Sequence, residues 1–413
     1  MAIHVHSSSQ LGEKVETMIE WLASFGKTKN GGVTRLLYSE SWFFAQEALK
    51  EKMNQCGLNA YYDDVGNLFG RAEGTEDSSS VILIGSHIDT VIDGGKYDGS
   101  YGIISGLLAV EYLLKHCGPP KKTIEVVSLC EEEGSRFPIT YWGSGTITGK
   151  YTFEQIQELT DSQGIPFIKA MKDCGFGVGK FPSPLRNDIQ CFIEMHIEQG
   201  RMLEQKGKAL GIVSHIVGQR RYNITVIGES NHAGTTPMTD RRDAIVIASQ
   251  LITSIADKAK SSGVMATVGK MIVKPNVPNV IAGEVMFTLD VRHHNEDLLQ
   301  HFCLEIAQDL QRVSDQNGVN IIAEEWMKVK PVAMDSYLIK ISTEVAKHQN
   351  LPYEFLVSGA GHDSQVFGAY CPTALFFVPS YKGISHSPKE FTDKLDLERG
   401  LKFLIEYLYQ LAY

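Results

Sequence analysis

Apolar residues follow two patterns along most of the chain, and each pattern predicts a different layer of structure. Continuous apolar runs, which are typical of strands buried on both faces by helices, occur at 81–85, 123–129, 192–196 and 373–378. Apolar residues at helical spacing occur at 11–25, 40–56, 102–117, 337–348 and 393–411. This order predicts an α/β domain with a parallel or mixed sheet, whose ligands gather beyond the carboxyl ends of its strands.

The pattern changes between residues 215 and 329. Strands, two of them with the alternation expected when one face is exposed, are predicted at 222–226, 264–273, 284–292 and 319–326. Helices are predicted at 240–259 and 298–313. Strand-helix-strand-strand-helix-strand is the ferredoxin-like order. We therefore expect residues 215–329 to form an inserted α+β domain, and residues 1–214 and 330–413 to form the larger domain.

The composition, with 43% apolar and 21% charged residues, is that of a globular protein. The formal net charge of −10 argues against general binding to nucleic acid or anionic membranes. No apolar stretch approaches the ~20 residues of a membrane span. The seven cysteines are scattered, so neither a disulfide framework nor a zinc ribbon is indicated. Because residues 1–6 also lack the features of a secretory signal, we expect a cytoplasmic protein.

Five segments of the chain carry residues that bind metals, at 85–90, 94–99, 131–133, 194–196 and 383–388. A single histidine is more often structural than a ligand, and an acidic run is more often a solvated turn. Several such segments at one edge of the inferred sheet favour a metal site instead. Three adjacent carboxylates, Glu131 to Glu133, repel one another unless a cation neutralises them. Imidazole with carboxylate suits zinc, manganese, cobalt or nickel rather than calcium.

The motifs in these segments resemble those of the two-metal hydrolases related to aminoacylase and carboxypeptidase G. The resemblance rests on Gly85-Ser86-His87-Ile88-Asp89-Thr90, Tyr97-Asp98-Gly99, Glu131-Glu132-Glu133-Gly134 and Glu194-Met195-His196-Ile197-Glu198-Gln199-Gly200. The carbamoyl-amidohydrolase branch, which contains N-carbamoyl-L-amino-acid hydrolases, β-ureidopropionases and allantoate amidohydrolases, is indicated by Asn231-His232-Ala233-Gly234-Thr235-Thr236-Pro237-Met238. Residues 217–222, 228–232 and 358–363 are most similar to allantoate amidohydrolases, and the match runs from about Gly31 to the C-terminus.

This resemblance implies a fold and a set of metal ligands. The larger domain would be a zinc-aminopeptidase-like catalytic domain with a mixed sheet, and the inserted domain would serve in dimerisation and as a lid. Each subunit would bind two divalent ions, with manganese expected first and zinc, cobalt or nickel as alternatives. One ion would be bound by His87, Asp98 and His196. The other would be bound by Glu133 and His386, with Asp98 bridging the two ions.

The resemblance also implies catalytic roles. Asp89 would fix the tautomer of the nearby imidazole of His87. Glu132 would be the general base that takes a proton from the attacking water and later delivers it to the leaving nitrogen. Glu131 has no part in this acid–base scheme, so we expect it to be a solvated or structural acid. His232 would reach into the active site of the other subunit of a homodimer and polarise the scissile carbonyl.

The substrate implied by the resemblance is a small ureido carboxylate. Allantoate would be hydrolysed in purine degradation to ureidoglycine, ammonia and carbon dioxide, and ureidoglycolate would follow by spontaneous loss of ammonia. The residues implied in substrate binding are Gln199, Gln219, Arg221, His232, Asn279, Arg292 and Gly361. Arg292 suits a carboxylate because its planar guanidinium binds both oxygens, although a surface salt bridge fits the sequence equally well.

Three other functions remain open from the sequence. The alternative within the branch is an N-carbamoyl-L-amino-acid hydrolase or a β-ureidopropionase. A peptidase or deacylase belongs to the wider family. A metal-binding protein without turnover would lack the base or a ligand, whereas Glu132 and all five proposed ligands are present.

Overall fold

The structure is a computed structural model that describes residues 10–413. The secretory-signal prediction concerns residues 1–6, which lie outside the described residues. The chain divides into two compact units. The first unit contains the residues up to Ser214 together with Met334–Leu356 and His362–Tyr413, and the second contains His215–Ala333 with Val357–Gly361. In the part of the chain that the structure describes, no helix is both long and apolar enough to cross a membrane.

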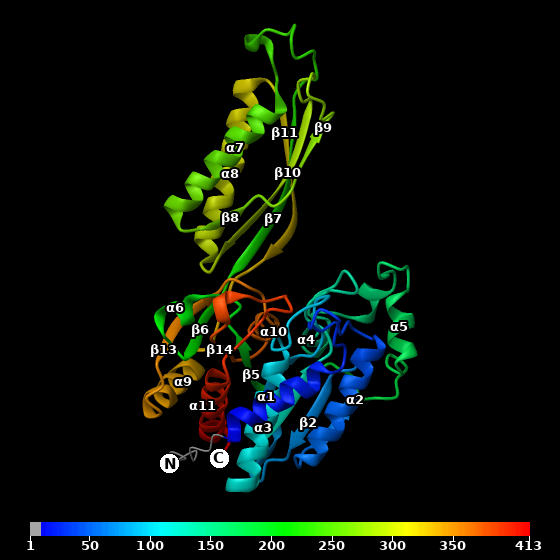
Figure 1. The fold of residues 1–413 in the computed structure, drawn as a ribbon, viewed down its shortest axis with the longest axis vertical. Helices are drawn as coiled ribbons and strands as arrows, with labels where there is room; N and C mark the ends of the chain where they lie inside the picture. The colour runs from blue at the N-terminus through cyan, green and yellow to red at the C-terminus, as the bar shows by residue number, and fades with distance from the viewer. Residues whose placement is uncertain (1–9) are drawn as a thin grey trace. The chain divides into compact units, whose positions relative to one another are not determined.

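A mixed sheet forms the centre of the first unit (Figure 1). Its parallel strands lie in the order β4 (Lys122–Leu129), β3 (Asp77–His87), β5 (Ile189–Ile197) and β14 (Thr373–Val378). Beyond β4 lie the antiparallel strands β2 (Leu68–Ala72) and β1 (Asn59–Tyr62). Beyond β14 lies the antiparallel strand β6 (Leu210–Ile216), which pairs with β13 (Tyr353–Ser358) and β12 (Val332–Ala333). The predicted mixed α/β fold is confirmed.

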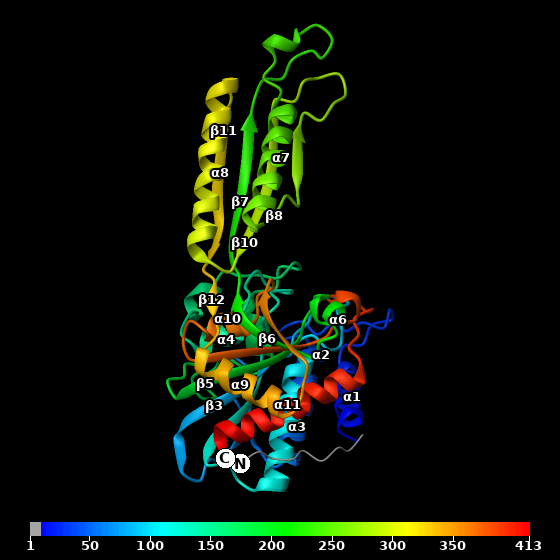
Figure 2. The ribbon, with the colours of Figure 1, turned by 90° about the vertical axis from the view of Figure 1, so that its left-hand side faces the viewer.

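Helices cover both faces of this sheet (Figure 2). On one face α3 (Ser100–Cys117) packs on β3, β4 and β5, and α11 (Lys394–Ala412) packs on α3 and β14. The same layer contains α1 (Gln10–Ala23), α2 (Glu40–Gln55) and α9 (Ser336–His348). On the other face lie two short helices, α4 (Trp142–Ile147) and α10 (Asp363–Phe367), and further short helices are α5 (Phe167–Asp173) and α6 (Met202–Lys206).

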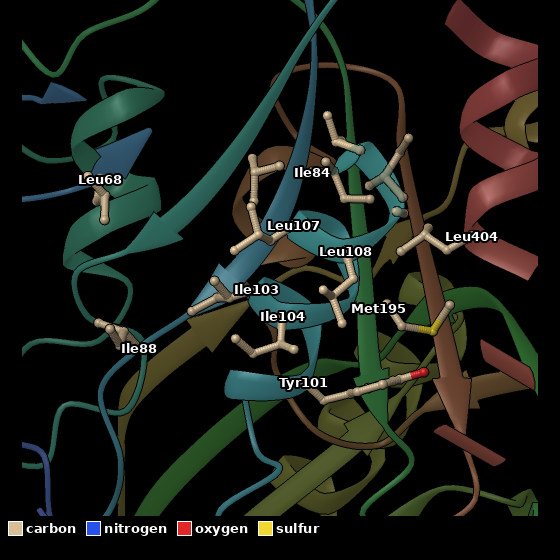
Figure 3. Close-up of a cluster of buried hydrophobic side chains, with 14 of the residues drawn as sticks. Leu68, Ile84, Ile88, Tyr101, Ile103, Ile104, Leu107, Leu108, Met195 and Leu404 are labelled. Carbon is tan, nitrogen blue, oxygen red and sulfur yellow. The ribbon is translucent and has the colours of Figure 1, made fainter. Parts of the chain in front are cut away.

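The continuous apolar runs are explained by this burial on two faces. In β3, Ile82 and Ile84 belong to the core that contains α3, whereas Val81 and Leu83 belong to a separate core with side chains of α4 and α10. The two sets alternate because successive side chains of a strand point to opposite faces. Figure 3 shows apolar side chains of α3 near Ile84, Met195 of β5 and Leu404 of α11. The packed strands and α3 thereby form a rigid base for the loops at the carboxyl ends of the strands.

The second unit contains a separate antiparallel sheet with two helices on one face (Figure 1). Its elements are β7 (Gly218–Ile227), α7 (Ala244–Ser262), β8 (Met265–Thr267), β9 (Met271–Lys274), β10 (Glu284–His293), α8 (Glu296–Asn317) and β11 (Asn320–Val329). The strand order is β11-β7-β10, and both β8 and β9 pair with the free edge of β10. The single strand expected at 264–273 is therefore two short strands, separated by residues 268–270. The order of elements is ferredoxin-like.

Candidate metal centre

The side chains expected to bind metal converge beyond the carboxyl ends of the parallel strands in the first unit. His87 is the last residue of β3, His196 lies near the end of β5, and Glu133 follows β4. Asp98 precedes α3, and His386 lies in the loop between β14 and α11. Three groups have ligand atoms within 4.8 Å of one another: His87 with Asp98 and His196, His87 with Glu132 and Glu133, and Asp98 with Glu133 and His386.

Asp98 lies at the centre of these groups. One carboxylate oxygen, Oδ1, is 3.0 Å from Nε2 of His196 and 3.5 Å from Nε2 of His87. The other oxygen, Oδ2, is 3.1 Å from Nε2 of His386. Burial raises the pKa of Asp98, but the three imidazoles outweigh burial and hold this pKa well below its usual range. The two oxygens of Asp98 thus face two different sets of ligands, which is the arrangement that a bridging carboxylate requires.

The pKa values of the neighbouring acids are shifted in the opposite direction to that of Asp98. Burial raises the pKa of Glu133 to about 7, and the charge of Asp98 adds to the effect. Burial also raises the pKa of Glu132 well above its usual range, with a further contribution from Glu133. The hydrogen bond with Asp98 raises the pKa of His386 to about 9. These shifts identify a buried excess of carboxylates, which a bound cation would offset.

Asp89 organises the acidic segment more directly than it organises His87. Asp89 is 1% exposed, and its carboxylate accepts hydrogen bonds from the backbone N–H groups of Glu132, at 2.9 Å, and Glu133, at 3.2 Å. Nδ1 of His87 is 3.0 Å from the backbone carbonyl of Asp89 and 3.4 Å from its carboxylate. The carbonyl, which can only accept a hydrogen bond, therefore favours the tautomer with the proton on Nδ1.

Glu131 is a buried structural acid. It is 2% exposed, and its carboxylate accepts hydrogen bonds from the backbone N–H groups of Gly134 and Trp142. These contacts close the turn after β4 and connect it to the start of α4. Of the two alternatives expected for Glu131, the structure has the structural one rather than the solvated one.

Further polar side chains, from the loops after β5 and β14, contact Asp98 or its neighbours. Gln199 donates a hydrogen bond from Nε2 to Oδ2 of Asp98, at 3.0 Å, and another to the hydroxyl of Ser385, at 3.2 Å. Glu390 accepts hydrogen bonds from the backbone of Asp98 and from Ser385. Burial raises the pKa of Glu390 to about 7. Gln199 was singled out from the sequence, whereas Ser385 and Glu390 were not.

Two more polar residues, His362 and Asp363, lie beside the cluster. The sequence motifs assigned neither of them a role. The ring of His362 lies 4.6 Å from the ring of His196, measured between centroids, and no described residue hydrogen-bonds to its buried Nε2. Asp363 accepts a hydrogen bond from Ser144 at 2.6 Å. Burial, together with His196, holds the pKa of His362 well below its usual value. His362 is therefore neutral at neutral pH.

Three expected substrate residues of the second unit converge on one acid, Asp290, on the face of the sheet opposite the helices. Its carboxylate accepts hydrogen bonds from Gln219 at 2.6 Å, Arg221 at 2.7 Å and Arg292 at 2.9 Å. Arg292 also donates to the carbonyl of Gly359 at 2.8 Å. Asp290 could have been found in the sequence, because it lies two residues from Arg292 and so on the same face of β10.

A cavity of about 550 Å³ lies at this position within the second unit. It is lined by Arg221, Asp290 and Arg292 together with Trp326 and Gly359. The guanidinium of Arg221 lies 5.3 Å from the ring centroid of Trp326, within the range of a cation–π contact. The sequence contained no pattern that distinguished Trp326 from an ordinary strand residue.

His232 and Asn279 lie together but apart from the Asp290 group. His232 forms a β-bridge with Val280, and the N–H of Ala233 donates to the carbonyl of Asn279. Both side chains are exposed. In the β7–β10 ladder Arg292 is opposite Gln219, and the ladder ends eight residues later at Ile227 and Glu284, before the His232 segment. At about 3.4 Å per residue, the ladder alone extends ~27 Å from Arg292 to its end. Gly361 ends the segment Val357–Gly361 of the same unit.

Known proteins resemble this chain along nearly its whole length. A family model described as peptidase family M20/M25/M40 matches residues 83–410. Allantoate amidohydrolase from Bacillus subtilis is 47% identical over 397 residues, which cover 96% of this chain and 96% of that protein. Allantoate amidohydrolase from Escherichia coli is 44% identical over 403 residues, which cover 97% of this chain and 98% of that protein.

Solved structures resemble the chain as well. An amidase of the hydantoinase/carbamoylase family from Burkholderia multivorans has a TM-score of 0.92 at 32% identity, covering 97% of this chain and 98% of that one. The family resemblance that was inferred from the sequence motifs is confirmed by these matches. The chain belongs to the peptidase family M20/M25/M40.

Proposed function

We propose that this protein is a metal-dependent amidohydrolase that cleaves a ureido C–N bond of allantoate in purine degradation, giving ureidoglycine, ammonia and carbon dioxide. The observation that carries the proposal is the 47% identity to an allantoate amidohydrolase over 96% of both chains. The chemistry of the cluster agrees with the proposal. Hydrolysis of a ureido group needs an activated water and a polarised carbonyl, and metal ions held by these side chains would supply both. The seven cysteines are free thiols, which fits the proposed cytoplasmic location.

The residues present fit a pair of divalent metal ions. Imidazoles and carboxylates with ligand atoms within 4.8 Å of one another suit manganese, zinc, cobalt or nickel, and the buried excess of acid calls for positive charge. We propose that His87, Asp98 and His196 hold one ion, that Asp98, Glu133 and His386 hold the other, and that manganese is the native metal. When bound, the ions supply Lewis-acid polarisation of the carbonyl and a lowered pKa for water.

Glu132 is the residue that we assign as general base. Its carboxylate has an oxygen within 4.8 Å of ligand atoms of His87 and Glu133, so it borders the reaction site. Its backbone is held by the hydrogen bond from its N–H to Asp89, which limits the positions that the side chain can reach. The burial that raises its pKa also makes the carboxylate a better proton acceptor. Glu132 takes a proton from the attacking water and delivers it to the leaving nitrogen.

Arg292 and His232 are proposed to act on the substrate from different subunits of a homodimer. Arg292 binds the substrate carboxylate, and His232 polarises the scissile carbonyl. The ~27 Å along the β7–β10 ladder supports this division, because one small molecule does not span that distance. Gln199, Gln219, Arg221, Asn279 and Gly361 complete the proposed substrate contacts.

Ammonia release from allantoate by the purified, manganese-loaded protein tests the proposed function. We expect turnover with manganese and none after chelation. Absence of ammonia release with manganese, zinc, cobalt or nickel would contradict the proposal. Specificity constants for allantoate and for N-carbamoyl-L-amino acids distinguish the alternative activity, which the structural similarity to the hydantoinase/carbamoylase family favours. A higher kcat/KM for a carbamoyl amino acid would establish that alternative.

Mixing two inactive variants tests the dimer. We expect His232→Ala and Arg292→Ala each to lose activity. An equal mixture of the two variants should regain about a quarter of the wild-type activity after subunit exchange. Half of the dimers would then contain one subunit of each variant, and each of these would carry one intact site of two. Failure of the mixture to regain activity after subunit exchange would refute a site that combines the two residues from different subunits.

A further inference from the structure

One carboxylate that is not a proposed metal ligand holds together two loops that carry proposed ligands. Glu390 is 4% exposed and lies four residues after His386 in the loop between β14 and α11. Its Oε1 accepts hydrogen bonds from the backbone N–H groups of Tyr97, at 2.9 Å, and Asp98, at 3.1 Å. Its Oε2 accepts a hydrogen bond from the hydroxyl of Ser385, at 2.7 Å. One of the three donors belongs to the proposed ligand Asp98, and the other two belong to residues next to a proposed ligand in the sequence.

The loop before Asp98 is shaped around this carboxylate. A Cβ atom at Gly95 would lie 2.0 Å from the carboxyl carbon of Glu390, far inside van der Waals contact. Only a residue without a side chain allows the carboxylate to reach the two N–H groups. The hydroxyl of Ser385 also lies 3.5 Å from Oδ2 of Asp98. Residues of both loops therefore accommodate the contact, which joins Asp98 and Glu390, 292 positions apart in the sequence.

We propose that Glu390 is a positioning residue for the metal centre, which sets the backbone of Asp98 and the position of His386 relative to each other. The inference rests on the proposed function, because it takes Asp98 and His386 as metal ligands. Asp98 would serve both ions, so a shift of its backbone would disturb both. His386 has a half-exposed side chain and a left-handed backbone, with a φ of 53°, and neither burial nor an ordinary conformation holds it. Partners of this kind typically change metal affinity 10- to 100-fold when removed.

A purely structural role for Glu390 would produce a different result, and a matched control separates the two. Glu406 of α11 is 1% exposed and accepts a hydrogen bond from Nε2 of Gln349 at 2.8 Å. Like Glu390, it is a buried glutamate of the first unit, but it belongs to no part of the proposed metal centre. Replacing either residue by alanine removes buried hydrogen bonds and lowers the free energy of unfolding. Only the change at Glu390 should alter metal binding.

The experiment measures the affinity of the full-length protein for Mn²⁺ alone by competition with a chromogenic chelator, and for Co²⁺ by its visible absorption. We expect Glu390→Ala to weaken Mn²⁺ binding about 10- to 100-fold and to change the Co²⁺ spectrum. Glu390→Gln should restore most of the affinity, because its amide oxygen still accepts from both N–H groups. Gly95→Ala, which displaces the carboxylate without removing it, should weaken binding as Glu390→Ala does. Glu406→Ala should bind Mn²⁺ as the wild type does.

The outcomes separate this inference from the proposed function. Wild-type protein that binds neither Mn²⁺ nor Co²⁺, and neither zinc nor nickel in the same competition, would overturn both. Wild-type protein that binds metal, with affinity within twofold in Glu390→Ala and Gly95→Ala, would overturn the role of Glu390 alone. Equal losses of affinity in Glu390→Ala and Glu406→Ala would also overturn it, because they would reflect stability. If Glu390→Ala does not fold, Gly95→Ala and Glu390→Gln decide the question by the same measurement.

Discussion

Replacing Asp89 by asparagine tests how the acidic segment after β4 is held. The carboxylate of Asp89 accepts one hydrogen bond from the N–H of Glu132 and one from the N–H of Glu133. Asparagine has nearly the same shape, but only one of its two terminal atoms accepts a hydrogen bond. Whichever way the amide is oriented, its NH₂ group faces a backbone N–H group, and that N–H loses its partner.

The size of the effect should depend on whether metal is bound. A buried N–H without a partner costs about 1–3 kcal/mol. In the metal-free protein, removing the charge of Asp89 offsets part of this cost, because that charge raises the pKa of Glu131 and Glu133. We therefore expect the metal-free variant to lose about 1 kcal/mol of unfolding free energy. With metal bound the same negative charge is favourable, so we expect Mn²⁺ affinity and kcat each to fall about 10- to 100-fold.

Urea unfolding of the metal-free protein, chelator competition for Mn²⁺ and steady-state ammonia release measure the three quantities. Asp335→Asn is the control, because Asp335 caps α9 through the N–H of Leu338, and asparagine is an equally good cap. Asp89→Asn with wild-type Mn²⁺ affinity and wild-type kcat would refute the reasoning. A loss of more than ~3 kcal/mol in the metal-free protein would also refute it, because the relief of repulsion would then be absent.

Three further predictions concern other parts of the molecule. Glu132→Gln should bind Mn²⁺ as the wild type does but lower kcat by about 10²- to 10⁴-fold, and a retained kcat would refute its role as base. Arg292→Lys should raise KM for allantoate about 10- to 100-fold in steady-state assays, because lysine cannot bind Asp290 and the carbonyl of Gly359 with one planar group. Burial raises the pKa of Asp63 to about 7, so its contribution favours folding below pH 4 and is lost as the pH rises to 7. The free energy of unfolding, measured with urea from pH 4 to 8, should therefore fall less steeply with pH in Asp63→Asn than in the wild type, by up to roughly 4 kcal/mol over this range. Parallel pH dependences in the two proteins would contradict this.

The layers of the fold could be read from the chain because they depend on local patterns. The middle of β3, Val81–Ile84, and all of β14 apart from its first residue are continuous apolar runs, and strands with one exposed face, such as β10, alternate. The types of the candidate metal ligands were equally readable, since His87, Asp98 and Glu133 carry their chemistry in the residue itself. The division of 264–273 into β8 and β9 was not readable, because the tertiary pairing with β10 decides where each strand ends.

The sequence by itself therefore determined the layers of the first unit, the ferredoxin-like order of the second, the family, and the residue types gathered at one sheet edge. Only the tertiary structure decided that Asp89 holds the backbone of the acidic segment, that Glu131 is buried, and that Asp290 collects the substrate-binding candidates of β7 and β10. It also decided that Glu390 reaches Asp98 across 292 residues. The reason is physical: periodicity and side-chain chemistry are properties of neighbouring residues, whereas a hydrogen bond depends on where distant segments meet.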